Sequence, residues 1–196
     1  MEMGNKPAVS HHLNTRQIAV IGMLSSISIV LGLTGYGFIP LPIAKATIMH
    51  IPVIIGAILE GPVVGMLIGL IFGVFSIFQN MSSPGLLSFA FYNPLVSVLP
   101  RVLIGLTSYY CYKLVAGRFK ALGVGFGAAI GSLTNTFGVL GMIYLLYAAR
   151  YAEAKGISAA SSAKVIFGVA LTNGLPEAII AVIITVPVVV AVMNRK

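Results

Sequence analysis

The most restrictive feature of this sequence is a series of six apolar segments, most of them close to the length of a membrane-spanning helix. They cover residues 16–34, 47–59, 63–80, 93–115, 122–149 and 165–193. An α-helix needs about 20 apolar residues to cross the hydrocarbon core of a bilayer. With 58% hydrophobic and only 8% charged residues, the chain has too little polar surface to fold in water. We therefore expect an all-α membrane protein, a bundle of six transmembrane helices.

The residues between these segments predict a short tail and one membrane domain. Residues 1–15 are polar, and the first apolar segment is followed by no small-residue cleavage site, so we interpret that segment as a retained helix. Gly and Pro at 35–42, 60–62 and 81–85 predict loops. The short second segment contains Pro52, which predicts a tilted, kinked or partly spanning helix. The sixth segment is expected to kink at Gly174, Pro176 and Pro187.

The distribution of Lys and Arg predicts that both termini are cytoplasmic. In that orientation the cytoplasmic side carries seven basic residues and the outer side four, as the positive-inside rule requires. The cytoplasmic set is Lys6, Arg16, Lys113, Arg118, Lys120, Arg195 and Lys196, and the outer set is Lys45, Arg150, Lys155 and Lys164. The loops after the first, third and fifth helices then face outward, where they can cover a site that opens to the exterior.

Three polar side chains interrupt the apolar segments near mid-depth: Arg101, Asn135 and Glu177. Counted at about 1.5 Å per residue from the predicted helix ends, all three fall in the central half of a core about 30 Å thick. Such groups are costly in hydrocarbon unless they face the bundle interior. Two interpretations remain open. Arg101 and Glu177 form a structural ion pair between the fourth and sixth helices, or one or both line a ligand cavity.

Further candidate ligand contacts are amides and tyrosines. Asn173 lies four residues before Glu177 on the same helix face, so the amide and the carboxylate can bind hydroxyl or amide groups of a solute together. A hydrogen bond between helices is the alternative for Asn173. The remaining candidates lie near the predicted outer surface, where tyrosines also form interfacial belts. They are Asn80, Tyr92, Asn93 and Tyr144.

Several classes of protein are excluded by the residues the chain lacks. Its basic residues are scattered and have no aromatic platform beside them, which argues against nucleic-acid binding. The single cysteine, Cys111, excludes an internal disulfide and a thiolate metal cluster. His50 has no partner at metal-ligand spacing and is predicted to pack in the protein. No catalytic motif and no GxxxxGK[ST] phosphate loop is present, so we expect no enzyme and no cofactor, and any use of ATP requires another subunit.

The first helix carries small residues at helical spacing. Gly22 and Ser26 lie four residues apart, and Ala19 precedes them by one turn. Small side chains let another helix approach closely. We expect this surface to dock a second membrane protein, and packing within the chain is the alternative.

Several short motifs, taken together, resemble the substrate-binding S components of energy-coupling factor (ECF) vitamin transporters. The resemblance covers almost the whole chain, and the motifs that carry it lie at residues 15–19, 46–52, 60–62, 93–101 and 173–177. In that family an Ala-xxx-Ala motif on the first helix contacts the membrane-embedded coupling subunit. Gly22 and Ser26 stand at the matching positions and are also small.

The resemblance implies that residues 16–196 form a membrane-embedded domain that binds a water-soluble vitamin from outside the cell membrane. It implies three partners, a transmembrane coupling subunit and two cytoplasmic ATPases, and a release step in which the S component reorients in the bilayer. A buried arginine beside amides favours a ligand with a carboxylate, and among the vitamins this favours pantothenate. Riboflavin, folate and pyridoxine, and a stand-alone secondary carrier, remain the alternatives.

Overall fold

The architecture is that of a helical membrane protein. A computed structural model describes residues 13–40, 45–117 and 119–195. Within those ranges, five helical spans are long and apolar enough to cross a membrane, which confirms the predicted class. They are α1 (Thr15–Thr34), α3 (Pro62–Ser82), the span formed by α5 (Pro94–Ser97) and α6 (Leu99–Val115), α7 (Lys120–Lys155) and α8 (Ala159–Met193). The second predicted segment corresponds to α2 (Ile51–Glu60), whose ten residues reach only about 15 Å.

The segment before α2 is a small sheet, where a loop and the start of a helix were predicted. The strand β1 (Phe38–Pro40) pairs antiparallel with β2 (Lys45–Thr47), and Phe38 is opposite Thr47. The expectation that the second helix begins at residue 47 is therefore wrong. The helix begins at Ile51, and Pro52 lies in its first turn. Proline is tolerated there because the first-turn amides have no partner within the helix, so Pro52 produces no kink.

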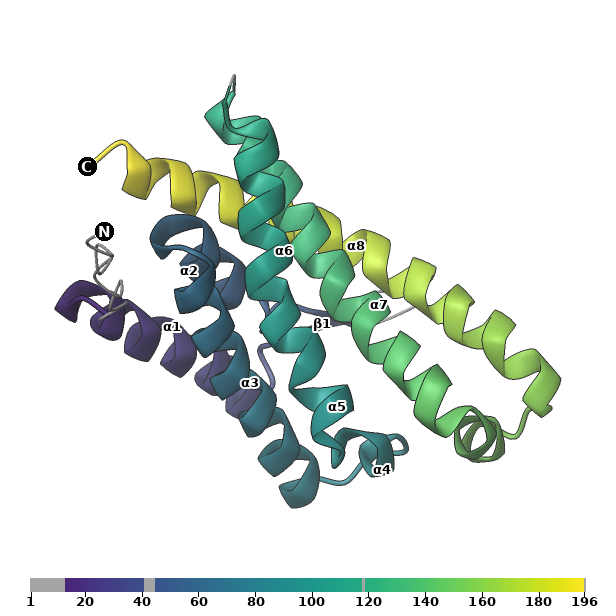
Figure 1. The fold of residues 1–196 in the computed structure, drawn as a ribbon. Coiled ribbons are helices and arrows are strands. Elements are labelled where there is room, and N and C mark those ends of the chain that lie inside the picture. The colour runs from purple at the N-terminus through teal and green to yellow at the C-terminus, as the bar shows by residue number, and fades with distance from the viewer. Residues whose placement is uncertain (1–12, 41–44, 118, 196) are drawn as a thin grey trace, which may run out of the picture.

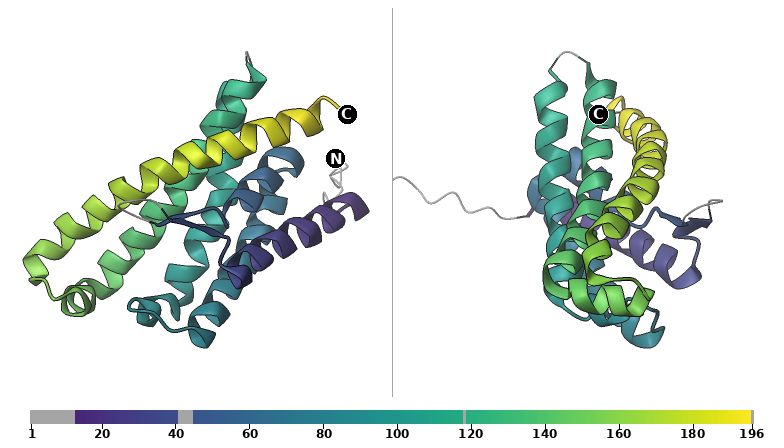
Figure 2. Two further views of the ribbon diagram at one scale, coloured as in Figure 1. Left: turned by 180° about the vertical axis from the view of Figure 1, so that it is seen from behind. Right: turned by 90° about the vertical axis from the view of Figure 1, so that its right-hand side faces the viewer.

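The loop after the third predicted helix and the last two helices also differ from expectation. A short helix, α4 (Ser88–Phe91), and then α5 precede α6, so the segment predicted at 93–115 is divided at Val98. The helix α7 is irregular at Tyr147, where φ is −138° and ψ is 23°. The helix α8 continues through Pro176 and Pro187, and it bends gradually along its length (Figure 2). The kinks predicted in α8 are therefore replaced by curvature, and the break lies in α7.

The helices pack around α2. In Figure 1, α7 and α8 run side by side along one edge and α1 forms the opposite edge, with α2, α3 and α6 between them. Residues 51–58 of α2 are all buried, so this short helix is enclosed by protein. Glycine allows α3 and α6 to approach closely, because a Cβ at Gly69 would collide with the backbone carbonyl of Arg101. This contact fixes the start of α6 against α3.

Candidate ligand-binding site

A cavity of about 350 Å³ lies among the hairpin, α3, α4, α6, α7 and α8. Its walls combine aromatic and aliphatic side chains with many polar ones. The polar lining residues are Thr47, Ser76, Gln79, Asn80, Arg101, Asn135, Thr136, Asn173 and Glu177. A largely apolar hollow with convergent polar groups is typical of small-molecule sites, and this volume is near the lower end of the usual range.

Arg101 lies in the first turn of α6, directly after Pro100. Its side chain is buried, and Nη1 donates a hydrogen bond to the carbonyl of Val96 at 2.8 Å. The guanidinium carbon lies 5.6 Å from the ring centroids of both Phe72 and Phe91. These contacts hold the positive charge in place at the cavity wall. Most N–H donors of the guanidinium are not used by them.

Glu177 joins three separate parts of the chain at the cavity wall. Its Oε1 accepts from the backbone N–H of Thr47 at 2.9 Å and from the Thr47 hydroxyl at 3.2 Å. Its Oε2 accepts from the hydroxyl of Thr136 at 2.6 Å. The carboxylate thus ties the hairpin and α7 to α8. Arg101 and Glu177, both within the described ranges, form no ion pair with each other, so the structural ion pair considered from the sequence is not present.

Two buried polar atoms at the cavity have no hydrogen-bond partner among the described residues. They are Nε of Arg101 and Oδ1 of Asn135. A buried donor or acceptor without a partner costs about 1–3 kcal/mol. A ligand that supplies an acceptor to Arg101 and a donor to Asn135 recovers that cost, so these two atoms point to the chemistry of the occupant.

Five of the eight residues predicted as ligand contacts line this cavity, and three do not. Asn80, Arg101, Asn135, Asn173 and Glu177 come together there. Asn80 also has a structural role, since its Oδ1 accepts from Ser88 of α4 at 2.8 Å.

The other three candidates lie outside the cavity lining. Tyr92 is exposed, and its hydroxyl donates to the backbone carbonyl of Asn80 at 3.4 Å. Asn93 caps α5 by accepting from the N–H of Leu95, and its amide donates to the hydroxyl of Tyr147. Tyr144 lines a different hollow between α7 and α8, because its helix turns that side away from the cavity.

Four polar lining residues were missed from the sequence: Thr47, Ser76, Gln79 and Thr136. Helix geometry could have found two of them, because Ser76 lies four residues before Asn80 on α3 and Gln79 lies three residues after Ser76. Thr136 is adjacent to Asn135 in α7. Only Thr47 had no local indication, because its place depends on the hairpin.

The predictions for His50 and Cys111 can be compared with their surroundings. His50 is fully buried, and its Nε2 lies 3.0 Å from the hydroxyl of Ser132, so it packs in the core as expected. Cys111 is half-buried on α6. Across the described part of the chain, no three His, Cys, Asp or Glu side chains are grouped closely enough to hold a metal ion.

The small residues of the first helix lie on an open surface. Ala19, Gly22 and Ser26 are all exposed, and a Cβ built on Gly22 meets no atom within 4 Å. Ser26 donates to the carbonyl of Gly22 at 2.8 Å, so its hydroxyl is satisfied within the helix. Larger apolar side chains, Met23 and Ile27, are exposed beside them.

A bundle of apolar helices around a polar cavity defines a membrane-embedded solute-binding protein. The family described as "ECF transporter, substrate-specific component" matches residues 16–189. The chain belongs to this family, as the sequence motifs predicted. It is therefore a vitamin-uptake component of a transporter in the prokaryotic plasma membrane, with several membrane spans, and is not an enzyme.

Two relatives have names that specify a solute. The chain is 31% identical to "Pantothenic acid transporter PanT" of Lactococcus lactis subsp. cremoris, over 91% of this chain and 94% of that protein. It is also 31% identical to "Pantothenate transporter PanT" of Leuconostoc mesenteroides subsp. mesenteroides, over 76% of this chain and 77% of that protein.

Proposed function

We propose that this protein is the high-affinity binding subunit for pantothenate uptake. It delivers its cargo through a complex with a transmembrane coupling subunit and two cytoplasmic ATPases, and it reorients in the membrane to do so. The family supports the transporter role. The names of two relatives that match most of the chain support the vitamin.

The observation that carries the choice of solute is that one cavity holds Arg101 and Glu177 without pairing them. Pantothenate has a carboxylate at one end and two hydroxyl groups at the other, with an amide between them. Its carboxylate binds the guanidinium, and its hydroxyl groups donate to the carboxylate of Glu177 and bond with the amide of Asn173. Riboflavin and pyridoxine have no carboxylate for Arg101. Folate has carboxylates but is large for a cavity of about 350 Å³.

The same proposal includes the topology. We propose that α2 completes a bundle of six helices, that both termini are cytoplasmic and that residues 1–15 form a cytoplasmic tail on a membrane domain of residues 16–196. The ends of the bundle support this, because α1 begins and α8 ends on the same side of the molecule (Figures 1 and 2). The distribution of basic residues supports the same orientation.

The coupling subunit docks on α1 in this proposal, over Ala19, Gly22 and Ser26. The exposure of these residues supports it, since a small-residue face that is open in the isolated chain lets a partner helix approach closely. The other face of α1 packs on α2 and α3.

The test of the solute compares pantothenate with pantothenol, in which a hydroxyl group replaces the carboxylate. Charge-assisted hydrogen bonds contribute about 1.5–3 kcal/mol, so the purified protein is expected to bind pantothenate roughly 10- to 150-fold more tightly. Arg101→Gln removes that preference by weakening pantothenate alone. Isothermal titration calorimetry in detergent or nanodiscs measures both constants.

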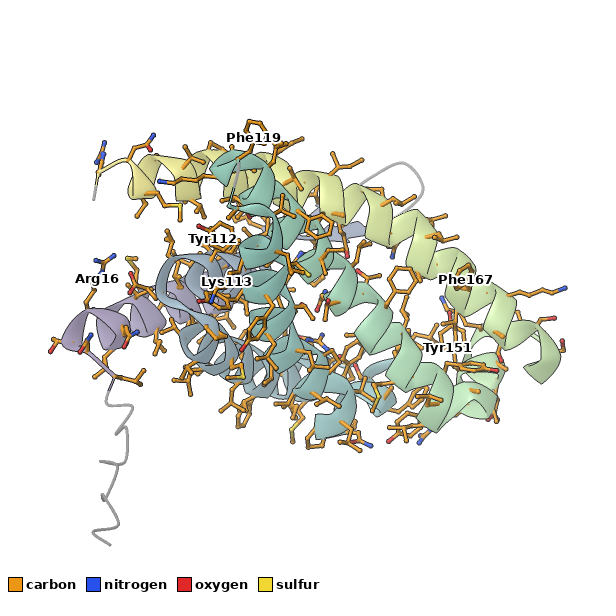
Figure 3. The ribbon with its side chains drawn as sticks, turned by 45° about the horizontal axis from the view of Figure 1, so that its top comes forward. Arg16, Tyr112, Lys113, Phe119, Tyr151 and Phe167 are labelled. Atoms are coloured by element: carbon orange, nitrogen blue, oxygen red, sulfur yellow. The ribbon has the colours of Figure 1, made fainter. Side chains whose placement is uncertain are left out.

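Lys113→Gln is the matched control, because Lys113 (labelled in Figure 3) lies on the same helix, is exposed and does not line the cavity. It keeps the preference. A preference that survives in Arg101→Gln contradicts the assignment of the carboxylate, and tight binding of another vitamin in place of pantothenate contradicts the solute. Uptake by vesicles that contain this chain alone identifies a secondary carrier.

A further inference from the structure

A second hollow lies on the outer surface of α7 and α8. It is a groove of about 480 Å³, and it shares the side chain of Leu140 with the ligand cavity. Its walls are almost entirely apolar: Phe137, Gly141 and Tyr144 come from α7, and Phe167 and Ala170 from α8. Lys164 is the one charged residue among those that line it, and its side chain is exposed.

The groove is short, and two of its aromatic rings meet across it. The lining residues lie within positions 137–144 of α7 and 163–170 of α8, and each stretch corresponds to about 10 Å of helix length. Phe137 and Phe167 contact each other across it with ring centroids 6.3 Å apart, and Phe167 projects from α8 (Figure 3). A transmembrane helix is about 10–12 Å wide and needs a contact stripe along much of its length. A short recess of this kind suits a flexible hydrocarbon chain better than a second helix.

The position of Lys164 identifies the rest of the ligand. It lies near the beginning of α8, beside Tyr144, at the end of the groove away from Phe137 and Ala170. A lysine at the end of a transmembrane helix extends its ammonium group toward the lipid headgroups. The positive charge of Lys164 is complementary to the phosphate of a lipid whose headgroup has a net negative charge.

We propose that this groove binds one anionic phospholipid, with an acyl chain between α7 and α8 and its phosphate at Lys164. The site is separate from the ligand cavity, and Leu140 forms the partition between them. The proposal does not depend on which solute the cavity binds.

The composition of the chain provides a clean reporter, because it contains no tryptophan. Phe167→Trp places a single indole in the groove. Reconstitution into phosphatidylcholine vesicles with small amounts of acyl-brominated phosphatidylglycerol or acyl-brominated phosphatidylcholine then measures which lipid quenches it. One lysine near the membrane surface contributes about 1 kcal/mol toward an anionic lipid, so we expect an apparent association constant about fivefold larger for phosphatidylglycerol.

Two variants in the Phe167→Trp background locate the lipid. Lys164→Gln is expected to bring the ratio of the two constants close to one. Gly141→Leu is expected to do the same, because a Cβ on Gly141 meets no atom within 4 Å and the larger side chain occupies space in the groove. Gly168→Leu is the matched control, since Gly168 is equally free of neighbours but does not line the groove. It keeps the fivefold ratio.

A tryptophan placed outside the groove provides the last control. Phe78→Trp on α3 is exposed and far along the chain from α7 and α8, and it is expected to give a ratio near one. A ratio near one for Phe167→Trp overturns the proposal, and so does a preference that survives Gly141→Leu. A third outcome is a ratio near one for Phe167→Trp together with a loss of assembly with the coupling subunit in Gly141→Leu. In that case the groove binds a protein partner and the proposal is wrong.

Discussion

The two hollows on either side of Leu140 differ in what their walls leave unsatisfied. The cavity contains two charged side chains that do not pair and two buried polar atoms that have no partner among the described residues. The groove is larger, at about 480 Å³ against 350 Å³, but it contains only apolar walls and one lysine that reaches the surface. Volume alone would favour the groove as the solute site. Unsatisfied hydrogen-bonding groups favour the cavity, because only a polar solute can recover their cost.

The largest effect is expected from a change that deforms the cavity and leaves the groove intact. Gly69→Leu inserts a side chain between α3 and the carbonyl of Arg101, where even a Cβ would collide. Overpacking of this kind costs about 3 kcal/mol or more, and it displaces the guanidinium. We expect a lower midpoint of thermal unfolding and a loss of pantothenate binding of more than 100-fold.

Gly69→Ala provides a milder step in the same direction, for the case in which the leucine variant does not fold. Gly168→Leu is the control, since it adds the same side chain where there is space. If Gly69→Ala folds and binds as the wild type does, the close approach of α3 to α6 does not position Arg101, and the contrast between the two hollows loses its structural basis.

A smaller effect is expected from the hydrogen bond between Thr136 and Glu177. Thr136→Val keeps the shape of the side chain and leaves Oε2 of Glu177 without that donor. The loss is about 1 kcal/mol, or roughly fivefold in the pantothenate dissociation constant.

Thr134→Val is the matched control. Thr134 lies two residues earlier on α7, and its hydroxyl lies within hydrogen-bond distance of the Thr107 hydroxyl and the carbonyl of Ile130, outside the cavity lining. Lipid quenching in the groove is expected to stay constant in both variants. An equal loss of pantothenate affinity in the two variants would mean that Thr136 acts through general packing of α7 and not through its hydrogen bond to Glu177.

Much of the fold could be predicted because membrane helices are defined by length and hydropathy. The apolar segments correspond to α1, α3, α6, α7 and α8, and their ends differ by a few residues. The hairpin could not be predicted, since its strands have only three residues each. It is held by a contact between Thr47 and Glu177, which are 130 positions apart.

The site was predictable as a set of residue types at depth, but the direction of each side chain was not. Thr136 lines the cavity and the next residue, Phe137, lines the groove, while Leu140 lines both and Gly141 lines the groove alone. Adjacent residues differ by about 100° around the helix, so a small error in rotation moves a residue between hollows. Tyr144, which was predicted as a ligand contact, lines the groove and not the cavity. Arg101 and Glu177 share a cavity without touching, and depth estimates carry no information about that distance.

The smallest effect on solute binding is expected from a change that touches neither hollow. Gly22→Leu adds a large side chain to the exposed face of α1, where a Cβ meets no atom of the chain within 4 Å. Pantothenate affinity and lipid quenching are expected to stay within twofold of the wild type. Assembly with the coupling subunit and ATP-driven uptake are expected to fail, because the leucine keeps a partner helix from approaching closely. Co-purification with the coupling subunit and vesicle uptake measure these outcomes.

The exposed Ile18 on the same helix provides a control for a substitution on this surface that adds no bulk. Ile18→Leu keeps the size of a side chain that is already 57% exposed, and it is expected to leave assembly unchanged. Normal uptake by Gly22→Leu would rule out this face as the docking surface and would leave the small residues of α1 without a partner. Weakened pantothenate binding by the same variant would show that α1 is coupled to the cavity, and solute recognition would then extend beyond the hollow lined by Arg101 and Glu177.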